Sequence, residues 1–91
     1  EVRDLARLAG LSVARFHARF ASETGQTPQE FVRLRRLHQG RALLLSTGLT
    51  VGEIAARVGY ASQSAFTAAL AREYGTTPRV IRREAHDKLR E

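Results

Sequence analysis

The side chains that could do chemistry in this 91-residue chain are hydrogen-bonding groups and cations, which bind partners rather than break bonds. The chain contains no Cys, so a disulfide, a thiol nucleophile and a Cys-ligated metal site are excluded. Its three His residues are scattered, and neither a phosphate loop nor a converging pair of acids is present. This pattern argues against an enzyme and predicts no metal or other cofactor.

Charge is the strongest signal in the composition. Fifteen Lys and Arg residues, fourteen of them Arg, oppose nine acidic residues, which gives a net charge of +6 and a pI near 11.3. This balance fits a polyanionic partner, although a solvated basic surface or a high-GC genome gives the same count. No segment approaches the roughly 18 apolar residues of a transmembrane helix, and the N-terminus lacks a signal-peptide layout. We therefore expect a soluble protein with no membrane partner.

Two predicted helices would present small and polar side chains to a partner. In the helix predicted over residues 63–74, Ser62 caps the start and Phe66 and Leu70 face inward. Its outward residues are then Gln63, Ser64, Thr67 and Ala68. In the helix predicted over residues 13–24, Phe16 and Phe20 face inward, and the outward residues include Ala14, Arg15, His17 and Ala18.

These two helices belong to two copies of one sequence pattern. The first part of the repeat aligns Leu5, Ala6, Ala9, Gly10 and Leu11 with Ile54, Ala55, Val58, Gly59 and Tyr60. After one extra residue in the second copy, the alignment continues with Phe16, Phe20, Glu23, Gly25, Thr27, Pro28, Phe31 and Arg33 against Phe66, Leu70, Glu73, Gly75, Thr77, Pro78, Ile81 and Arg83. A repeat this long predicts two copies of one supersecondary unit.

A long helix over residues 27–46 is predicted to join the copies. Thr27 and Pro28 form a helix start, and the apolar stripe and the Arg residues that follow give the helix an apolar and a basic side. Its roughly 19 residues would span about 28 Å. Gly40 lies inside this helix, where it costs about 1 kcal/mol relative to Ala, so either two helices pack closely there or the helix is locally weak. Close packing is the favoured alternative.

The remaining segments complete an all-α prediction of about seven helices. Short amphipathic helices are expected over residues 1–9 and 51–58, and the second begins with a capping box formed by Thr50 and Glu53. The last helix begins at Thr77 and Pro78, and the charged tail is expected to fray from Ala85. The predicted segments are residues 1–26, the linker helix 27–46, residues 50–84, and the tail 85–91. Each copy alone buries little surface, so both should pack against the linker helix.

A short helix, a tight Gly turn and a longer helix form the helix-turn-helix layout. Ala6 and Ala55 precede the turn glycines, Gly10 and Gly59, by four residues, and they must be small because the two helices cross closely. The second helix can then enter the major groove of DNA, where base edges show distinct donor and acceptor patterns. A plain helical hairpin is the alternative for one copy. Two copies together with the basic charge favour DNA binding.

The motif residues closely resemble the AraC/XylS family of bacterial transcription regulators. They cover residues 1–83 and are Leu5, Ala6, Gly10, Leu11, Ser12, Phe16, Phe20, Glu23, Thr24, Gly25, Thr27, Pro28, Phe31, Arg36, Leu37, Leu43, Leu44, Val51, Glu53, Ile54, Ala55, Val58, Gly59, Tyr60, Ser64, Phe66, Glu73, Tyr74, Gly75, Thr77, Pro78 and Arg82. The resemblance implies two homeodomain-like helix-turn-helix units joined by a linker helix. It also implies that both recognition helices read double-stranded DNA in successive major-groove segments, about 34 Å apart.

The resemblance also implies roles for individual residues. Base-contacting positions are Ala14, His17, Ala18, Gln63, Ser64, Thr67 and Ala68. Phosphate-contacting positions are Ser12, Arg15, Arg41 and Arg82, for each of which a solvated surface is the alternative, and Arg36 is expected to be structural. Gln63 is the strongest candidate, because its amide can bind adenine bidentately. For His17, an exposed side chain with no special role is an equal alternative, and Thr67 could contact a thymine methyl group or a phosphate, or be ordinary helix surface. Ala18 and Ala68 stand where the family often has Arg, so specificity could depend on apolar contacts, on Arg15 or Arg19, or on DNA shape.

Further expectations concern the whole protein. The family has another helix before the position of Glu1, so part of the first copy's core is expected to be exposed. The resemblance implies an effector-sensing and dimerising N-terminal domain, a monomeric fragment, and a bacterial, cytoplasmic transcription regulator that acts as an activator. RNA polymerase is a candidate second partner. A helical protein-interaction module is the alternative function, and a weak salt dependence of binding would favour it.

Overall fold

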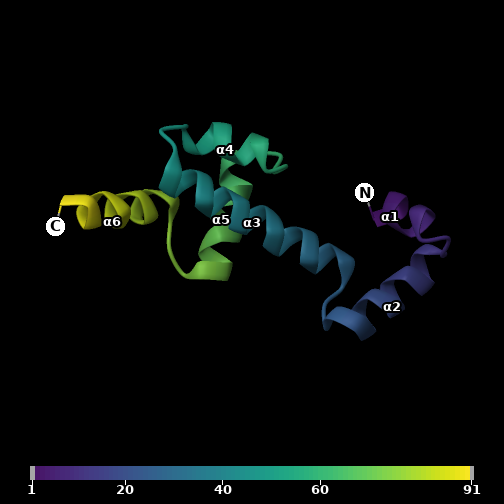
Figure 1. Ribbon diagram of the computed structural model, residues 1–91. Helices are drawn as coiled ribbons and strands as arrows, with labels where there is room; N and C mark the ends of the chain where they lie inside the picture. The colour runs from purple at the N-terminus through teal and green to yellow at the C-terminus, as the bar shows by residue number, and fades with distance from the viewer. Residues whose placement is uncertain (1, 91) are drawn as a thin grey trace. The chain divides into compact units, whose positions relative to one another are not determined.

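The computed structural model describes residues 2–90 and contains six helices and no strand in that range (Figure 1). Their bounds are α1 Val2–Leu8, α2 Val13–Thr24, α3 Pro28–Ser46, α4 Val51–Arg57, α5 Gln63–Tyr74 and α6 Pro78–Arg90. The all-α prediction is confirmed, with one helix fewer than the seven expected. Glu1 and Glu91, at the ends of the predicted first helix and tail, lie outside the described residues.

The last helix is longer than expected. The prediction that the tail frays from Ala85 is wrong, because α6 continues to Arg90. Glu84 and Lys88 are four residues apart on this helix, with the acid on the N-terminal side, which is the favourable order for an ion pair along a helix. Ile81, Ala85 and Leu89 also follow one another at helical spacing. Helical periodicity and charge order therefore extend through a segment whose polarity resembles that of a tail.

The chain divides into two compact units, Glu1–Arg35 (unit 1) and Arg36–Glu91 (unit 2). The boundary falls inside α3, so the linker helix does not form a separate element. Its first turns belong to unit 1, and the remainder belongs to unit 2.

Side-chain caps recur at equivalent positions of the repeat. The hydroxyl groups of Ser12 and Ser62 accept hydrogen bonds from the backbone N–H three residues later, at 3.2 and 3.0 Å. Those of Thr27 and Thr77 do the same at the starts of α3 and α6, at 3.1 and 3.2 Å. Each bond satisfies one of the free donors of a helix N-terminus. The helix starts predicted from the sequence are therefore confirmed.

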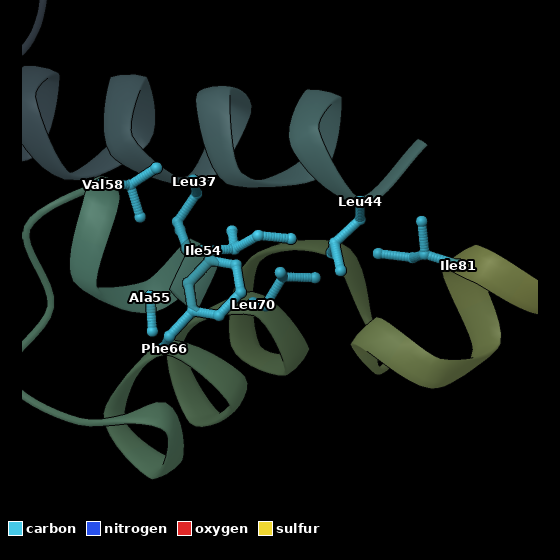
Figure 2. Packing of buried hydrophobic residues seen from close by; sticks show 8 residues of the cluster. All are labelled: Leu37, Leu44, Ile54, Ala55, Val58, Phe66, Leu70 and Ile81. Carbon is cyan, nitrogen blue, oxygen red and sulfur yellow. The ribbon is translucent and has the colours of Figure 1, made fainter. Parts of the chain in front are cut away.

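Unit 2 has a closed hydrophobic core. Figure 2 shows the Phe66 ring pointing from α5 into a cluster to which α3 contributes Leu37 and Leu44. The buried members are Leu37, Leu44, Ile54, Ala55, Val58, Phe66, Leu70 and Ile81, all at most 6% exposed. A Cβ atom on Gly40 would lie 2.5 Å from Cε1 of Phe66 and 2.7 Å from its Cζ. Gly40 therefore marks a close approach between α3 and the Phe66 ring, and the close-packing alternative is confirmed.

Unit 1 is packed more loosely. Ala6 of α1 is 1% exposed, but α2 contains no buried residue. The ring of Phe20 lies between those of Phe16 and Phe31, with centroids 5.7 and 5.4 Å away. Phe31 remains 41% exposed and Leu5 42% exposed. Unit 1 therefore holds its apolar side chains together in a small aromatic cluster that solvent still reaches.

Candidate nucleic-acid interface

The turns inside the two helical pairs share one backbone geometry. Gly10 and Gly59 have φ values of 70° and 95°, in the left-handed region that favours glycine. The N–H of the residue after each glycine donates to the carbonyl of Ala6 or Ala55, at 3.0 and 2.9 Å. The N–H of each glycine donates to the next carbonyl along, at 3.0 and 3.2 Å. This pair of bonds is the Schellman motif, which ends one helix and redirects the chain toward the next.

The small residues predicted at these turns are buried. Ala6 and Ala55 are each 1% exposed, in keeping with a close crossing of α1 with α2 and of α4 with α5. A Cβ atom on Gly59 would lie 3.1 Å from Nε of Arg36, so this guanidinium lies against the second turn. The contact favours the structural role predicted for Arg36. The structure therefore contains two helix-turn-helix units whose second helices are α2 and α5.

One side of α5 faces solvent and carries the four residues predicted for base contact. Gln63, Ser64 and Ala68 are exposed and Thr67 is half-buried. Together with Ala71 they line a shallow hollow on the surface of unit 2. Their spacing of one, four, five and eight residues from Gln63 places them on one helix face. The outward face predicted for this helix is therefore confirmed as a surface.

A neighbouring glycine gives Gln63 its space. Gly52 is the second residue of α4, and a Cβ atom there would lie 3.3 Å from Oε1 of Gln63. That distance is tighter than ordinary van der Waals contact, so a side chain at position 52 would displace the Gln63 amide. The sequence does not predict this neighbour, because the contact joins two helices across the turn.

The corresponding side of α2 differs in one respect. Ala14 and Ala18 are exposed, but His17 is half-buried. Nε2 of His17 lies 3.2 Å from the amide nitrogen Nε2 of Gln29, in the first turn of α3. From the sequence, Gln29 is predicted only to be part of the linker helix. The imidazole, which has this partner, is less exposed than its two alanine neighbours on the same face.

The predicted phosphate contacts lie in different environments. Ser12 uses its oxygen as the cap of α2, and a hydroxyl that accepts a bond still has its own hydrogen to donate. Arg15 is exposed on the first turn of α2. Arg19, a candidate for base contact, has its Nε 3.1 Å from a carboxylate oxygen of Glu23 on the same helix. An exposed pair of this kind contributes about 0.3–0.5 kcal/mol, so it can be exchanged for another anion at little cost.

Two other arginines are engaged within unit 2. The guanidinium carbon of Arg41 lies 5.7 Å from the ring centroid of Tyr74. Tyr74 is the last residue of α5 and lies about 16 Å along the helix from Gln63. Arg82 donates from Nε to the carbonyl of Leu44 at 3.2 Å and from Nη2 to that of Thr47 at 3.0 Å. These bonds satisfy free carbonyls at the end of α3. The structure thus gives Arg82 a structural role that the sequence did not predict.

Comparisons with known proteins identify the family. A protein-family model described as "Helix-turn-helix domain" matches residues 5–84. The chain also superposes on the DNA-binding domain of AdpA, solved in complex with a target DNA, with a TM-score of 0.90 and 31% identity, covering 97% of this chain and 79% of that one. The chain belongs to the AraC family of helix-turn-helix DNA-binding domains. Its fold matches the two-unit architecture that the resemblance implied.

Curated relatives agree with this AraC-family assignment. The chain is 34% identical over 77 residues to the probable transcriptional regulator LumQ of Photobacterium leiognathi, covering 85% of this chain and 31% of LumQ. It is 38% identical over 65 residues to the transcriptional activator RhaR of Cronobacter sakazakii, covering 71% of this chain and 23% of RhaR. The chain therefore spans less than a third of the length of either relative. These relatives are transcription regulators, so the chain is a DNA-binding domain and not an enzyme.

Two further observations concern the described part of this AraC-family domain. Within residues 2–90, no group of three or more His, Cys, Asp or Glu side chains could hold a metal ion. In the same range, none of the helices combines the length and the hydropathy that a membrane span requires.

Proposed function

We propose that this domain reads two successive segments of the major groove of double-stranded DNA, one with α2 and one with α5. The observation that carries the proposal is the repeated Schellman turn, which in both units is followed by a helix with a solvent-facing side. Such a helix can enter the major groove, which is about 12 Å wide and admits an α-helix. A net charge of +6 favours approach to the phosphate backbone.

The two recognition helices differ in the chemistry they offer. On α5, the Gln63 amide can bind adenine bidentately, Ser64 and Thr67 can donate or accept, and Ala68 can contact a thymine methyl group. On α2, Ala14 and Ala18 offer only apolar contact, and His17 supplies the polar ring. We therefore expect the segment read by α5 to be the more sharply specified of the two.

Phosphate contacts would fix the domain on the duplex without reading sequence. Ser12 and Arg15, at the start of α2, are the first candidates, because both are exposed beside that recognition helix. Arg41 and Arg82 are the second candidates, and each would have to bind phosphate while it keeps or exchanges the contacts it makes within unit 2.

The complete regulator is proposed to be a cytoplasmic, bacterial transcription activator. The name of RhaR as an activator supports this direction of control. An effector-sensing N-terminal domain would make the complete protein a dimer, while this domain alone is a monomer, and RNA polymerase is the proposed protein partner. Transcription from a reporter promoter that carries the bound site tests the activator role, and repression of that promoter would contradict it.

The experiment for DNA reading is selection of bound duplexes from a random pool. The expected result is a two-part motif with segment centres about one helical turn, or 34 Å, apart. Affinity for the selected duplex should fall with salt by roughly 0.9 log unit per log unit of salt for each phosphate neutralised. Absence of a motif, together with weak binding that does not depend on salt, would contradict the proposal and favour a protein-interaction module.

A further inference from the structure

The first turn of α3 holds a side chain against the recognition helix of unit 1. Gln29 follows Pro28, which is buried, and the nearby Phe31 ring packs edge-on against Phe20 at 5.4 Å. These contacts fix the start of α3 beside α2. They bring Nε2 of Gln29 to 3.2 Å from Nε2 of His17, although twelve residues separate the two in sequence.

The chemistry of this contact determines where the imidazole carries its proton. An amide nitrogen has two hydrogens and no acceptor site, so Gln29 can only donate. With its amide nitrogen toward the ring, Gln29 donates and Nε2 of His17 accepts, which places the ring hydrogen on Nδ1. His17 is half-buried, and the contact with Gln29 occupies Nε2, which leaves Nδ1 as the ring nitrogen to offer to a ligand. The polar group that His17 offers to a ligand is then a donor.

We propose that Gln29 is a positioning residue for His17: it selects the Nδ1–H tautomer and makes α2 a reader of hydrogen-bond acceptors in the major groove. This inference rests on the proposed function and adds a specificity determinant from the linker helix to it. The acceptors available there are N7 and O6 of guanine, N7 of adenine and O4 of thymine. The Nε2–H tautomer of a free imidazole would instead place its donor at the other end of the ring.

The arrangement is particular to unit 1. The equivalent positions of the repeat in unit 2 carry Thr67 and Arg79, a hydroxyl and a guanidinium, and neither side chain has a tautomer to select. The two helices therefore differ in whether a neighbouring side chain determines the hydrogen-bonding character of the central polar residue. In unit 1 the setting comes from a residue outside the helix-turn-helix itself.

The tautomer can be measured without DNA. Long-range ¹⁵N–¹H correlation spectra of the imidazole, recorded at a pH where the ring is neutral, distinguish Nδ1–H from Nε2–H. The wild-type domain should show Nδ1–H for His17, Gln29→Ala should shift the ring toward Nε2–H, and Gln29→Glu, which can only accept, should invert the tautomer. Gln39→Ala, an exposed glutamine on the same helix, is the matched control. A wild-type Nε2–H ring, or a spectrum that Gln29→Ala leaves unchanged, would overturn the positioning role.

The specificity role has its own readout. Selection from a random duplex pool with Gln29→Ala should relax the preference at the base pair that His17 reads, by roughly fivefold, and leave the segment read by α5 unchanged. If the tautomer shifts but the selected motif does not change, the specificity role is overturned while the positioning role stands. If the wild-type domain selects no motif at all, the proposed function fails, and the spectra still decide whether Gln29 sets the ring.

Discussion

The two units form the same turns and helix caps, but they bury their apolar side chains to different extents. Both have the Schellman turn, the Ser cap and the Thr cap, yet Leu5 is 42% exposed where its counterpart Ile54 is fully buried. Phe16 is half-buried where Phe66 is fully buried. In unit 2, Leu37 and Leu44 of α3 lie over the helical pair, whereas unit 1 has only the first turns of α3. The comparison teaches that the repeat encodes the turn, and a third helix supplies the core.

The largest predicted difference between the units is in the stability lost when two equivalent aromatic residues are truncated. Phe66→Ala should cost about 3–5 kcal/mol of unfolding free energy, because it leaves a cavity in a closed core. Phe16→Ala should cost only about 1–2 kcal/mol, because part of its ring already faces solvent. Chemical denaturation measures both, and Phe66→Leu gives a milder variant if Phe66→Ala is unfolded. Equal losses at the two positions would contradict the difference in packing.

The close approach at Gly40 predicts the next largest effect. Gly40→Ala forces a methyl group to within 2.5 Å of the Phe66 ring, and the overpacking should destabilise unit 2 by about 2 kcal/mol despite the better helix propensity of Ala. Gly48→Ala is the control, because a Cβ atom there would meet no atom within 4 Å. A more stable Gly40→Ala variant would mean that the ring and α3 can separate freely.

Arg82 offers a test of whether its role is structural, phosphate-binding or both. Arg82→Ala removes two charge-assisted bonds to the end of α3 and should cost about 1–2 kcal/mol of unfolding free energy. The exposed neighbour Arg83, replaced by Ala, should change stability by less than about 0.5 kcal/mol. An additional decrease of roughly 0.9 in the salt slope of DNA binding would show that Arg82 also neutralises a phosphate. If the salt slope does not change, the role of Arg82 is structural only, at the end of α3.

The smallest predicted effect concerns Gly52, which lies beside Gln63 and has no glycine counterpart in unit 1. Gly52→Ala should raise stability by up to about 1 kcal/mol through helix propensity, yet displace the amide of Gln63. Affinity for the selected duplex should therefore fall by about threefold, corresponding to roughly 0.6 kcal/mol, because the amide must shift by a few tenths of an ångström. The equivalent position in unit 1 carries Arg3, and Arg3→Ala should leave DNA specificity unchanged. If Gly52→Ala binds the selected duplex as tightly as the wild-type domain does, the space at Gly52 does not determine how Gln63 binds.

Much of the local structure could be predicted from the sequence, because caps and turns depend on residues close together in the chain. Ser62, Gly59 and Thr77 act where the pattern predicted, and the periodicity of Phe66 and Leu70 identified the exposed side of α5. Gly40 could be interpreted because a glycine inside a helix needs a packing reason.

The missed features are contacts between helices. The bonds from Arg82 to the end of α3 span 35 and 38 residues, and the contact between His17 and Gln29 spans twelve. No periodicity encodes such pairs, since each depends on where two helices cross. The same reason explains why the space beside Gln63 could not be traced to Gly52. Residues that hold a binding group in place are therefore harder to predict than the group itself.

The most direct test of reading by two helices is the affinity of His17→Ala, Gln63→Ala and the double variant for the selected duplex, with each segment scrambled in turn. Gln63→Ala should lower affinity by roughly 5- to 150-fold, about 1–3 kcal/mol, only when its own segment is intact. His17→Ala should depend in the same way on the other segment, and the two free-energy losses should add. Equal losses on selected and fully scrambled duplexes, or dependence of both variants on one segment, would contradict reading by both units.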